Sequence, residues 1–291
     1  MKKASKNTTS KPKKFPEQSQ PGPPGREYKM HPKPEVIRKG YKGSDKLYGK
    51  VALITGGDSG IGRAVAVHFA REGADIAINY LEEVKDAMDT KKMVEKEGRH
   101  CVLIKGNLND PKVCKKIISE TIENFGKLNI LVNNAGTHYP KEDLKQVNDA
   151  QIRETFETNI ISMIRLTRLA LPHLKKGARI INTTSVTAYR GSDHLIDYAA
   201  TKGAIVSFTR SLASELVSKG ILVNAVAPGP IWTPLIPSSM DHVSDFGTKT
   251  PMGRAGQPSE VAPAFVYLAC EDSSYVTGQV MHVNGGDYKS S

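Results

Sequence analysis

The chain has 291 residues and a formal net charge of +11, with 41 Lys and Arg against 30 Asp and Glu. A chain of this length can bury one large hydrophobic core, and no apolar run reaches the roughly 18 residues that span a bilayer. The lysine-rich start is not followed by an apolar core, so we expect no secretory signal. Cys101, Cys114 and Cys270 are odd in number and lack metal-ligand spacing, which favours reduced thiols, a cytoplasmic location and no metal site.

The first 48 residues carry most of the positive charge. They hold 11 Lys and 2 Arg against 3 Glu and 1 Asp, which gives +9 of the formal +11. Such a basic, proline-rich segment cannot bury enough apolar surface to fold alone, so we expect residues 1–47 to be largely disordered or extended and residues 48–291 to form one domain. The composition favours a solvated arm, able to wrap a neighbouring subunit, over a contact with nucleic acid or an anionic membrane surface.

The next segment predicts a strand, a glycine turn, a helix and a second strand. The apolar run Val51–Ile54 is typical of a buried strand, and TGGDSGIG follows at Thr55–Gly62. Glycines in this turn would let the backbone bend tightly, approach a pyrophosphate and pack the helix on the strand; they are Gly56, Gly60 and Gly62. The helix from near Ile61 would point its positive end at the phosphates, and a strand at Ile76–Asn79 completes the unit. The glycines alone would also be compatible with a flexible loop, but this order of elements predicts a dinucleotide site.

The rest of the chain alternates between apolar runs and amphipathic stretches. Strands are expected at Cys101–Ile104, Ile130–Asn133, Arg179–Asn182, Leu222–Val226 and Val280–Val283. Helices are expected near Pro111–Phe125, Ala150–Leu174, Tyr198–Val217 and Ser259–Ala269. This alternation predicts an α/β fold, a single-domain Rossmann-type doubly wound parallel sheet of about seven strands with helices on both faces. Ligands of such sheets bind beyond the carboxyl ends of the strands, where Gly56, Asn134, Ser185 and Gly229 would lie.

A serine, a tyrosine and a lysine form the most informative pattern. Ser185 is followed thirteen residues later by Tyr198 and four after that by Lys202, in the sequence YAATK. In a helix the last two side chains would project from one face, and the ammonium would lower the pKa of the phenol. The result would be a proton donor and acceptor usable near neutral pH. A lone Tyr-x-x-x-Lys is expected by chance and Ser185 could simply cap a turn, so the interpretation depends on the neighbouring motifs.

Together these motifs resemble the classical short-chain dehydrogenase/reductase family, over about residues 48–288. They occur in the family's order, as TGGDSGIG at Thr55–Gly62, NNAG at Asn133–Gly136, Asn159, Ser185, YAATK at Tyr198–Lys202 and PGPIWT at Pro228–Thr233. The resemblance is strongest to bacterial members with a basic N-terminal extension, of the glucose/ribitol-dehydrogenase-like and aldehyde-reductase-like kinds.

The resemblance implies a role for each matching residue. Tyr198 would be the general acid/base and Ser185 would hydrogen-bond the same substrate oxygen. Lys202 would lower the tyrosine pKa and hold the nicotinamide ribose, while Asn159 would keep a water in a proton relay. Thr233 would contact the nicotinamide carboxamide. The implied cofactor-binding residues are Thr55, Gly56, Asp58, Ser59, Gly60, Ile61, Gly62, Asn79, Tyr80, Asn107, Leu108, Asn134, Ala135, Gly136, Tyr198, Lys202, Pro228, Gly229, Ile231 and Thr233.

The residues near the second strand bear on the choice of cofactor. A carboxylate at its end would select NAD and a cation would accept the 2′-phosphate of NADP, but the chain reads Asn79, Tyr80, Leu81. The acids Glu82 and Glu83 follow and would repel a phosphate, which favours NAD, with NADP as the alternative. Asn107 stands where many relatives have aspartate, and its amide oxygen can still accept the adenine amino proton.

The irregular segment Pro234–Gly256 fits a substrate lid, because loops of this length are usually functional or disordered. Side chains that could line the pocket beneath it are His138, Tyr139, Tyr189, His194 and Trp232. The expected activity is that of an NAD(P)-dependent oxidoreductase which interconverts an alcohol and a carbonyl on a small alcohol, polyol, sugar or aldehyde, in a homotetramer as is common in the family. The alternatives are a 3-oxoacyl thioester reductase, a nucleotide-sensing protein without turnover, and a nucleic-acid-binding protein that uses the basic extension.

Overall fold

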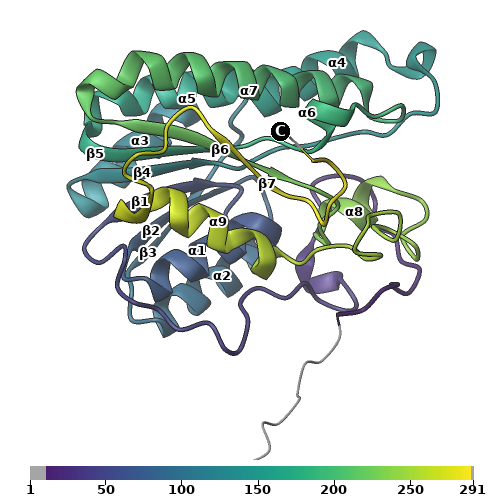
Figure 1. Ribbon diagram of the computed structural model, residues 1–291, viewed down its shortest axis with the longest axis horizontal. Helices are drawn as coiled ribbons and strands as arrows, with labels where there is room; N and C mark the ends of the chain where they lie inside the picture. Colours follow the sequence, from purple (N-terminus) through teal and green to yellow (C-terminus); the bar gives the residue numbers. More distant parts are fainter. Residues whose placement is uncertain (1–10, 290–291) are drawn as a thin grey trace, which may run out of the picture.

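The computed structural model describes residues 11–289 and is built around one parallel sheet (Figure 1). Its seven strands lie in the order β3-β2-β1-β4-β5-β6-β7. They are β1 (Val51–Thr55), β2 (Asp75–Tyr80), β3 (Cys101–Lys105), β4 (Leu128–Asn133), β5 (Leu174–Thr183), β6 (Leu222–Pro228) and β7 (Val280–Val283). The fold expected from the sequence is therefore confirmed.

Helices cover both faces of this sheet (Figure 1). On one face lie α1 (Gly60–Arg71), α2 (Val84–Lys96) and α9 (Pro258–Ala269), whose side chains share one buried core with β1 and β2. On the other face lie α3 (Pro111–Phe125), α4 (Asp149–Phe156), α5 (Ser162–Ala170) and α7 (Ile196–Leu216). Two short helices, α6 (Thr187–Arg190) and α8 (Leu235–Ser239), follow β5 and β6. Among residues 11–289, no helix is both long enough and apolar enough to cross a membrane.

The central position of β1 explains its apolar sequence and leaves a crevice at its carboxyl end. All five of its residues are buried, since helices cover both faces, and this requires a continuous apolar run rather than an alternating one. The chain proceeds from β1 to β2 and β3 on one side and to β4 and β5 on the other. Such a reversal of strand order leaves a crevice at the carboxyl ends of β1 and β4.

The structure differs from the sequence prediction in three elements. Helix α2 was not predicted, because its four buried residues include only two apolar ones, Ala87 and Val94, and they give a weak periodic signal. The expected helix Ala150–Leu174 is interrupted by a π-helical turn, Glu157–Ile161, which carries Asn159. Strand β5 begins at Leu174 rather than near Arg179. The sequence did not indicate its first residues, because Lys175 and Lys176 are exposed and interrupt the apolar run.

The part of the N-terminal extension that the structure describes, residues 11–47 (the arm), packs against the domain. It is extended, and its regular structure within this range is the single 3-10 turn Glu27–Lys29. Phe15 and Met30 are buried against Trp232 and the segment after it, in a small separate cluster. The sequence favoured a solvated arm, whereas in the structure these two side chains anchor the arm to the domain. Residues 1–10 lie outside the described residues.

Candidate active site

A cleft of about 1070 Å³ opens at the carboxyl ends of the strands. It is lined by Ser185 and by most of the residues predicted to bind a cofactor, namely Gly56, Asp58, Ser59, Gly60, Ile61, Asn79, Tyr80, Asn107, Leu108, Asn134, Ala135, Gly136, Tyr198, Lys202, Pro228, Gly229, Ile231 and Thr233. Three predicted residues do not line it and are buried, namely Thr55, Gly62 and Asn159. The topology thus brings together residues that are far apart in the sequence.

The glycine-rich turn has a shape that fits a dinucleotide pyrophosphate. Gly56 and Gly60 have positive φ angles of 58° and 53°, which favour glycine. Helix α1 begins at Gly60, and Ser59, Gly60 and Ile61 all line the cleft, so the positive end of the helix dipole faces it. A Cβ atom on Gly62 would lie 2.0 Å from the carbonyl oxygen of Gly56, so α1 can approach the turn only because residue 62 is glycine.

Asn134 holds three strand ends together beneath the turn. Its Nδ2 donates to the carbonyl oxygens of Thr55 at 3.2 Å and Gly56 at 3.1 Å, and its Oδ1 accepts from Thr183 Oγ1 at 3.4 Å. Its backbone N–H donates to Thr55 Oγ1 at 2.9 Å. These bonds connect the ends of β1, β4 and β5, which gives the cleft a fixed floor.

Ser185, Tyr198 and Lys202 meet on one side of this floor. Ser185 follows β5, and the other two lie one turn apart on α7, with Lys202 Nζ 5.3 Å from the centroid of the Tyr198 ring. Lys202 Nζ donates to the carbonyl oxygen of Thr183 at 2.9 Å, so its position is fixed. The helical spacing read from the sequence therefore places the ammonium beside the phenol ring.

The pKa values differ from the sequence expectation. Burial raises the pKa of Tyr198 to about 12, although its hydrogen bond with Ser185 acts in the opposite direction. Burial also lowers the pKa of Lys202 to about 8. Both shifts follow from desolvation, which disfavours the charged form of either group. The expected lowering of the tyrosine pKa by Lys202 is thus absent here, and the phenol is protonated at neutral pH.

Asn159 is completely buried in the π-helical turn between α4 and α5. Its Oδ1 accepts from the backbone N–H of Thr137 at 2.8 Å, and its Nδ2 donates to the Thr137 carbonyl at 2.9 Å and to Thr201 Oγ1 at 3.1 Å. It therefore connects the segment after β4 to α7, one residue before Lys202. Single π-turns are frequent at functional sites.

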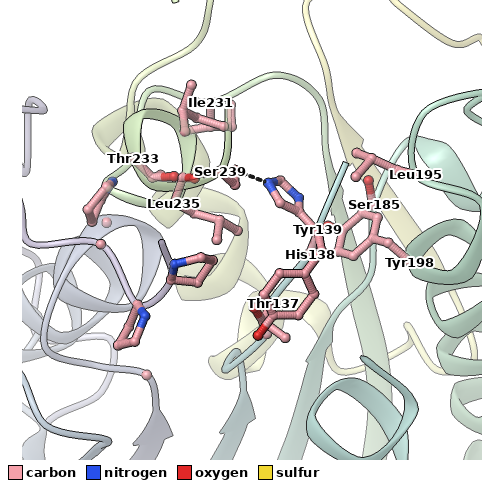
Figure 2. Close-up of a pocket in the computed structure, with 18 of the residues that line it drawn as sticks. Thr137, His138, Tyr139, Ser185, Leu195, Tyr198, Ile231, Thr233, Leu235 and Ser239 are labelled. Atoms are coloured by element: carbon pink, nitrogen blue, oxygen red, sulfur yellow. Dashed lines mark hydrogen bonds between the residues drawn. The ribbon is translucent and has the colours of Figure 1, made fainter. Parts of the chain in front are cut away.

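The cleft is lined by three of the five side chains proposed from the sequence, His138, Tyr139 and His194. Figure 2 shows the first two near Tyr198. Tyr189 instead packs on His282, with ring centroids 4.5 Å apart, away from this pocket. Trp232 is fully buried and stacks on Phe15 of the arm, with centroids 3.8 Å apart. Both predictions were wrong because an aromatic residue near a motif can equally serve packing.

His138 links the floor of the pocket to the segment after β6. Its Nε2 lies 2.6 Å from Ser239 Oγ of α8, the contact drawn dashed in Figure 2, and its ring packs edge-on against Tyr198. Burial and, secondarily, the charge of Lys202 lower the pKa of His138 to about 4, so the imidazole is neutral. The lining also contains residues that the sequence did not indicate, including Leu195, Leu235 and the arm residues Pro23, Pro24 and Gly25. No motif marks them, so only the fold could reveal them.

Lys202→Met is expected to make the protein more stable at pH 7. The wild type buries an ammonium whose pKa falls from 10.5 to about 8, so between these values the unfolded chain binds more protons and wild-type stability rises with pH. Below pH 8 the wild type bears the full cost of the buried charge, which the variant removes. We expect Tm to increase by about 2 °C or more at pH 7. Scanning calorimetry would measure this, with the exposed Lys115→Met of α3 as the control; an equal or lower Tm for Lys202→Met would contradict the burial argument.

Within the described part of the chain, no group of three or more His, Cys, Asp or Glu side chains could hold a metal ion. The parallel sheet, the glycine-rich turn and the cleft at the strand ends together are typical of a Rossmann-type dinucleotide-binding protein.

The chain belongs to the short-chain dehydrogenase/reductase family, since a family model described as "Enoyl-(Acyl carrier protein) reductase" matches residues 56–287. It is 50% identical over 278 residues to NADPH-dependent aldehyde reductase 1, chloroplastic, of Arabidopsis thaliana, covering 92% of this chain and 96% of that protein. It is 48% identical over 280 residues to glucose and ribitol dehydrogenase of Daucus carota, covering 94% and 96%. A solved short-chain dehydrogenase from Burkholderia cenocepacia in complex with NADP is similar with a TM-score of 0.79 and 32% identity, covering 83% of this chain and 99% of that one.

Proposed function

We propose that this oxidoreductase uses NAD or NADP to interconvert an alcohol and a carbonyl by hydride transfer, with Tyr198 as the acid/base. The observation that carries the proposal is the meeting of Ser185, Tyr198 and Lys202 in one cleft with the glycine-rich turn. A hydroxyl donor, a phenol and a cation are the groups that stabilise and protonate an oxygen on which negative charge develops.

The residues would act as follows. A bound nicotinamide supplies or accepts the hydride. Tyr198 is protonated at neutral pH, because burial raises its pKa to about 12, and this is the form that gives a proton to a carbonyl oxygen. Ser185, whose side chain lies near the Tyr198 ring in Figure 2, would donate to the same oxygen. Lys202 carries a positive charge beside the ring and would also hold the ribose, while Asn159 would orient a water in the proton relay.

A small, hydroxyl-bearing substrate is the class that the pocket favours. Its wall combines His138, Tyr139 and Ser239 with the apolar Leu195 and Leu235 (Figure 2). Polar groups at fixed positions in a largely apolar wall orient a ligand through its hydroxyls. The names of the Arabidopsis and carrot relatives, an aldehyde reductase and a glucose and ribitol dehydrogenase, agree with small aldehydes, sugars and polyols as substrates.

A substrate screen tests the proposal directly. The full-length protein would be assayed by cofactor absorbance against alcohols, polyols, sugars, aldehydes and a 3-oxoacyl thioester, with NAD and NADP in parallel. Turnover of an aldehyde, sugar or polyol supports the proposed class. Turnover of the thioester alone would favour the reductase alternative, and dinucleotide binding without any turnover would point to a nucleotide sensor.

We propose NAD as the preferred cofactor, on the basis of two buried acids. Asp58 and Glu83 both line the cleft next to Tyr80 and are 6% and 5% exposed. Burial, followed by the charge of Glu83, raises the pKa of Asp58 to about 7. The raised pKa means that the pair disfavours further negative charge, so a dianionic 2′-phosphate beside it would be disfavoured as well. The Burkholderia structure is named with NADP, and the Arabidopsis relative is named as NADPH-dependent. The preference is therefore tested with both cofactors.

Asp58→Asn is expected to improve the use of NADP. Removing one carboxylate from the pair reduces the repulsion of the extra phosphate, so we expect kcat/KM for NADP to rise about 3- to 10-fold while that for NAD changes by less than about 2-fold. Steady-state kinetics with both cofactors would measure the ratio. Asp89→Asn on α2 makes the same chemical change away from the cleft lining. An unchanged ratio in Asp58→Asn would remove the basis for the preference.

The oligomeric state and location stay predictions. Ile152, Ile161 and Ile164, in the α4–α5 layer, are exposed apolar side chains of the kind found at subunit contacts, which supports the proposed homotetramer. The three cysteines are buried free thiols, in keeping with the proposed cytoplasmic location.

A further inference from the structure

The arm is anchored directly to the glycine-rich turn. Glu27 is 1% exposed, and its Oε2 accepts a hydrogen bond of 2.6 Å from the backbone N–H of Gly60, the first residue of α1. Its other carboxylate oxygen pairs with Arg63. Asp86 of α2 accepts from the backbone N–H groups of Glu27 at 2.8 Å and Tyr28 at 3.0 Å, and it pairs with Arg63 at 3.1 Å. A buried cluster of three charged groups therefore fixes the arm behind the turn.

The same arm is also anchored to the segment after β6, here called the lid (residues 234–256). The backbone N–H of Phe15 donates to the carbonyl of Ser244 at 3.1 Å, and that of Gln20 donates to Pro237 at 2.6 Å. Glu17 accepts from the backbone N–H of Val243 at 3.1 Å. Figure 1 shows this part of the chain beside α8. One continuous segment, the arm, thus extends from the lid to the glycine-rich turn.

Between these two anchors the arm reaches the cleft itself. Pro23, Pro24 and Gly25 line it together with Gly60 and Pro234. The contact with the lid is tight, since a Cβ atom on Gly25 would lie 2.0 Å from the carbonyl oxygen of Pro234. The arm therefore supplies part of the wall of the cleft.

We propose that the arm is part of the dinucleotide-binding site, with Pro23, Pro24 and Gly25 as a wall over the bound dinucleotide and Glu27 as the positioning residue that holds this wall against the glycine-rich turn. The proposal rests on the function proposed above. It assigns the described part of the extension to the cofactor site of its own chain rather than to nucleic acid or to a neighbouring subunit. It also couples the position of the lid to occupation of the cleft.

Gly25→Ala in the full-length protein tests this proposal. The added methyl group cannot fit against the backbone of Pro234, so the wall must move. We expect the Kd for NAD and NADH, measured by calorimetric titration, to rise about tenfold or more. Gly40→Ala is the matched control, because it makes the same change in the same arm where nothing lies within 4 Å, and its Kd should stay within about twofold.

The single tryptophan reports the position of the arm without any assay of activity. Trp232 is buried under Phe15, so displacement of the arm should shift its emission to longer wavelength in Gly25→Ala and leave it unchanged in Gly40→Ala. If circular dichroism shows that Gly25→Ala is unfolded, Phe15→Leu replaces it, since this variant loosens the arm at its lid anchor, and the same rise in Kd is expected.

The outcomes separate the two proposals. A rise in Kd together with shifted emission supports a wall supplied by the arm. A wild type that binds NADH while the folded Gly25→Ala or Phe15→Leu variant binds it equally well overturns the inference and leaves the proposed function intact. A wild type that binds neither NAD(H) nor NADP(H) overturns both.

Discussion

Tyr198→Phe is expected to lose turnover by about 100- to 10,000-fold while keeping its affinity for NAD within about threefold. The size of the loss is that of a positioned general acid. The phenyl ring would still fill the same place against His138, so the shape of the cleft is preserved and only the hydroxyl group is removed. Steady-state kinetics and calorimetric titration with NAD would measure the two quantities on the same preparation.

Tyr189→Phe is the matched control for this variant. Tyr189 lies outside the pocket against His282, so the same loss of a hydroxyl should leave kcat within about twofold. If Tyr198→Phe keeps a third or more of the wild-type turnover, the proton donor has been assigned to the wrong group. A loss of NAD affinity as large as the loss of turnover would instead indicate a structural role for the phenol.

Gly62→Ala is expected to weaken dinucleotide binding by at least about 100-fold. Its Cβ atom would lie 2.0 Å from the Gly56 carbonyl oxygen and 2.7 Å from Asn134 Nδ2. Neither atom can move away easily, because the first belongs to the backbone and the second donates to the carbonyl oxygens of Thr55 and Gly56. Helix α1 must then move away from the turn, and its positive end no longer meets the phosphates at hydrogen-bonding distance. Overpacking of this kind also costs about 1–3 kcal/mol of stability.

Titration calorimetry and urea unfolding would follow the two effects of Gly62→Ala. Gly40→Ala again serves as the control, since its Cβ atom meets nothing within 4 Å. Retention of wild-type affinity in a folded Gly62→Ala protein would mean that the pyrophosphate does not bind at this turn.

The fold was predictable because its information is local. The buried run in β1 and the regular alternation of strands and helices indicate a parallel sheet before any contact is known. Helix α2 escaped prediction for the opposite reason, because Asp86 and Thr90 occupy buried positions where the pattern requires apolar residues. The buried polar side chains of Asp86 and Thr90 are bonded by Arg63, which lies on α1 more than twenty residues earlier. A local sequence pattern cannot reveal such a distant partner.

Most of the site residues that the sequence indicated line the cleft, but the sequence did not indicate their pKa values. Helical spacing alone places Tyr198 and Lys202 on one face of α7, as the sequence indicated. Their pKa values depend on how completely the surrounding fold removes water, which spacing does not reveal. The packing of the arm was likewise hidden, because it depends on the single pair Phe15 and Trp232, which are separated by more than two hundred residues.

The hydrogen bonds of Asn134 distinguish two parts of the candidate site that differ in how freely they can change. In the first part, the side-chain amide of Asn134 connects the ends of β1, β4 and β5 by hydrogen bonds. A substitution in this part therefore disturbs several strands at once. The other part, residues 234–256, is held mainly by loop contacts with the arm and by the bond between His138 and Ser239. If the proposed function holds, new substrate preferences can evolve by changes in residues 234–256 while the residues proposed for the redox step stay unchanged.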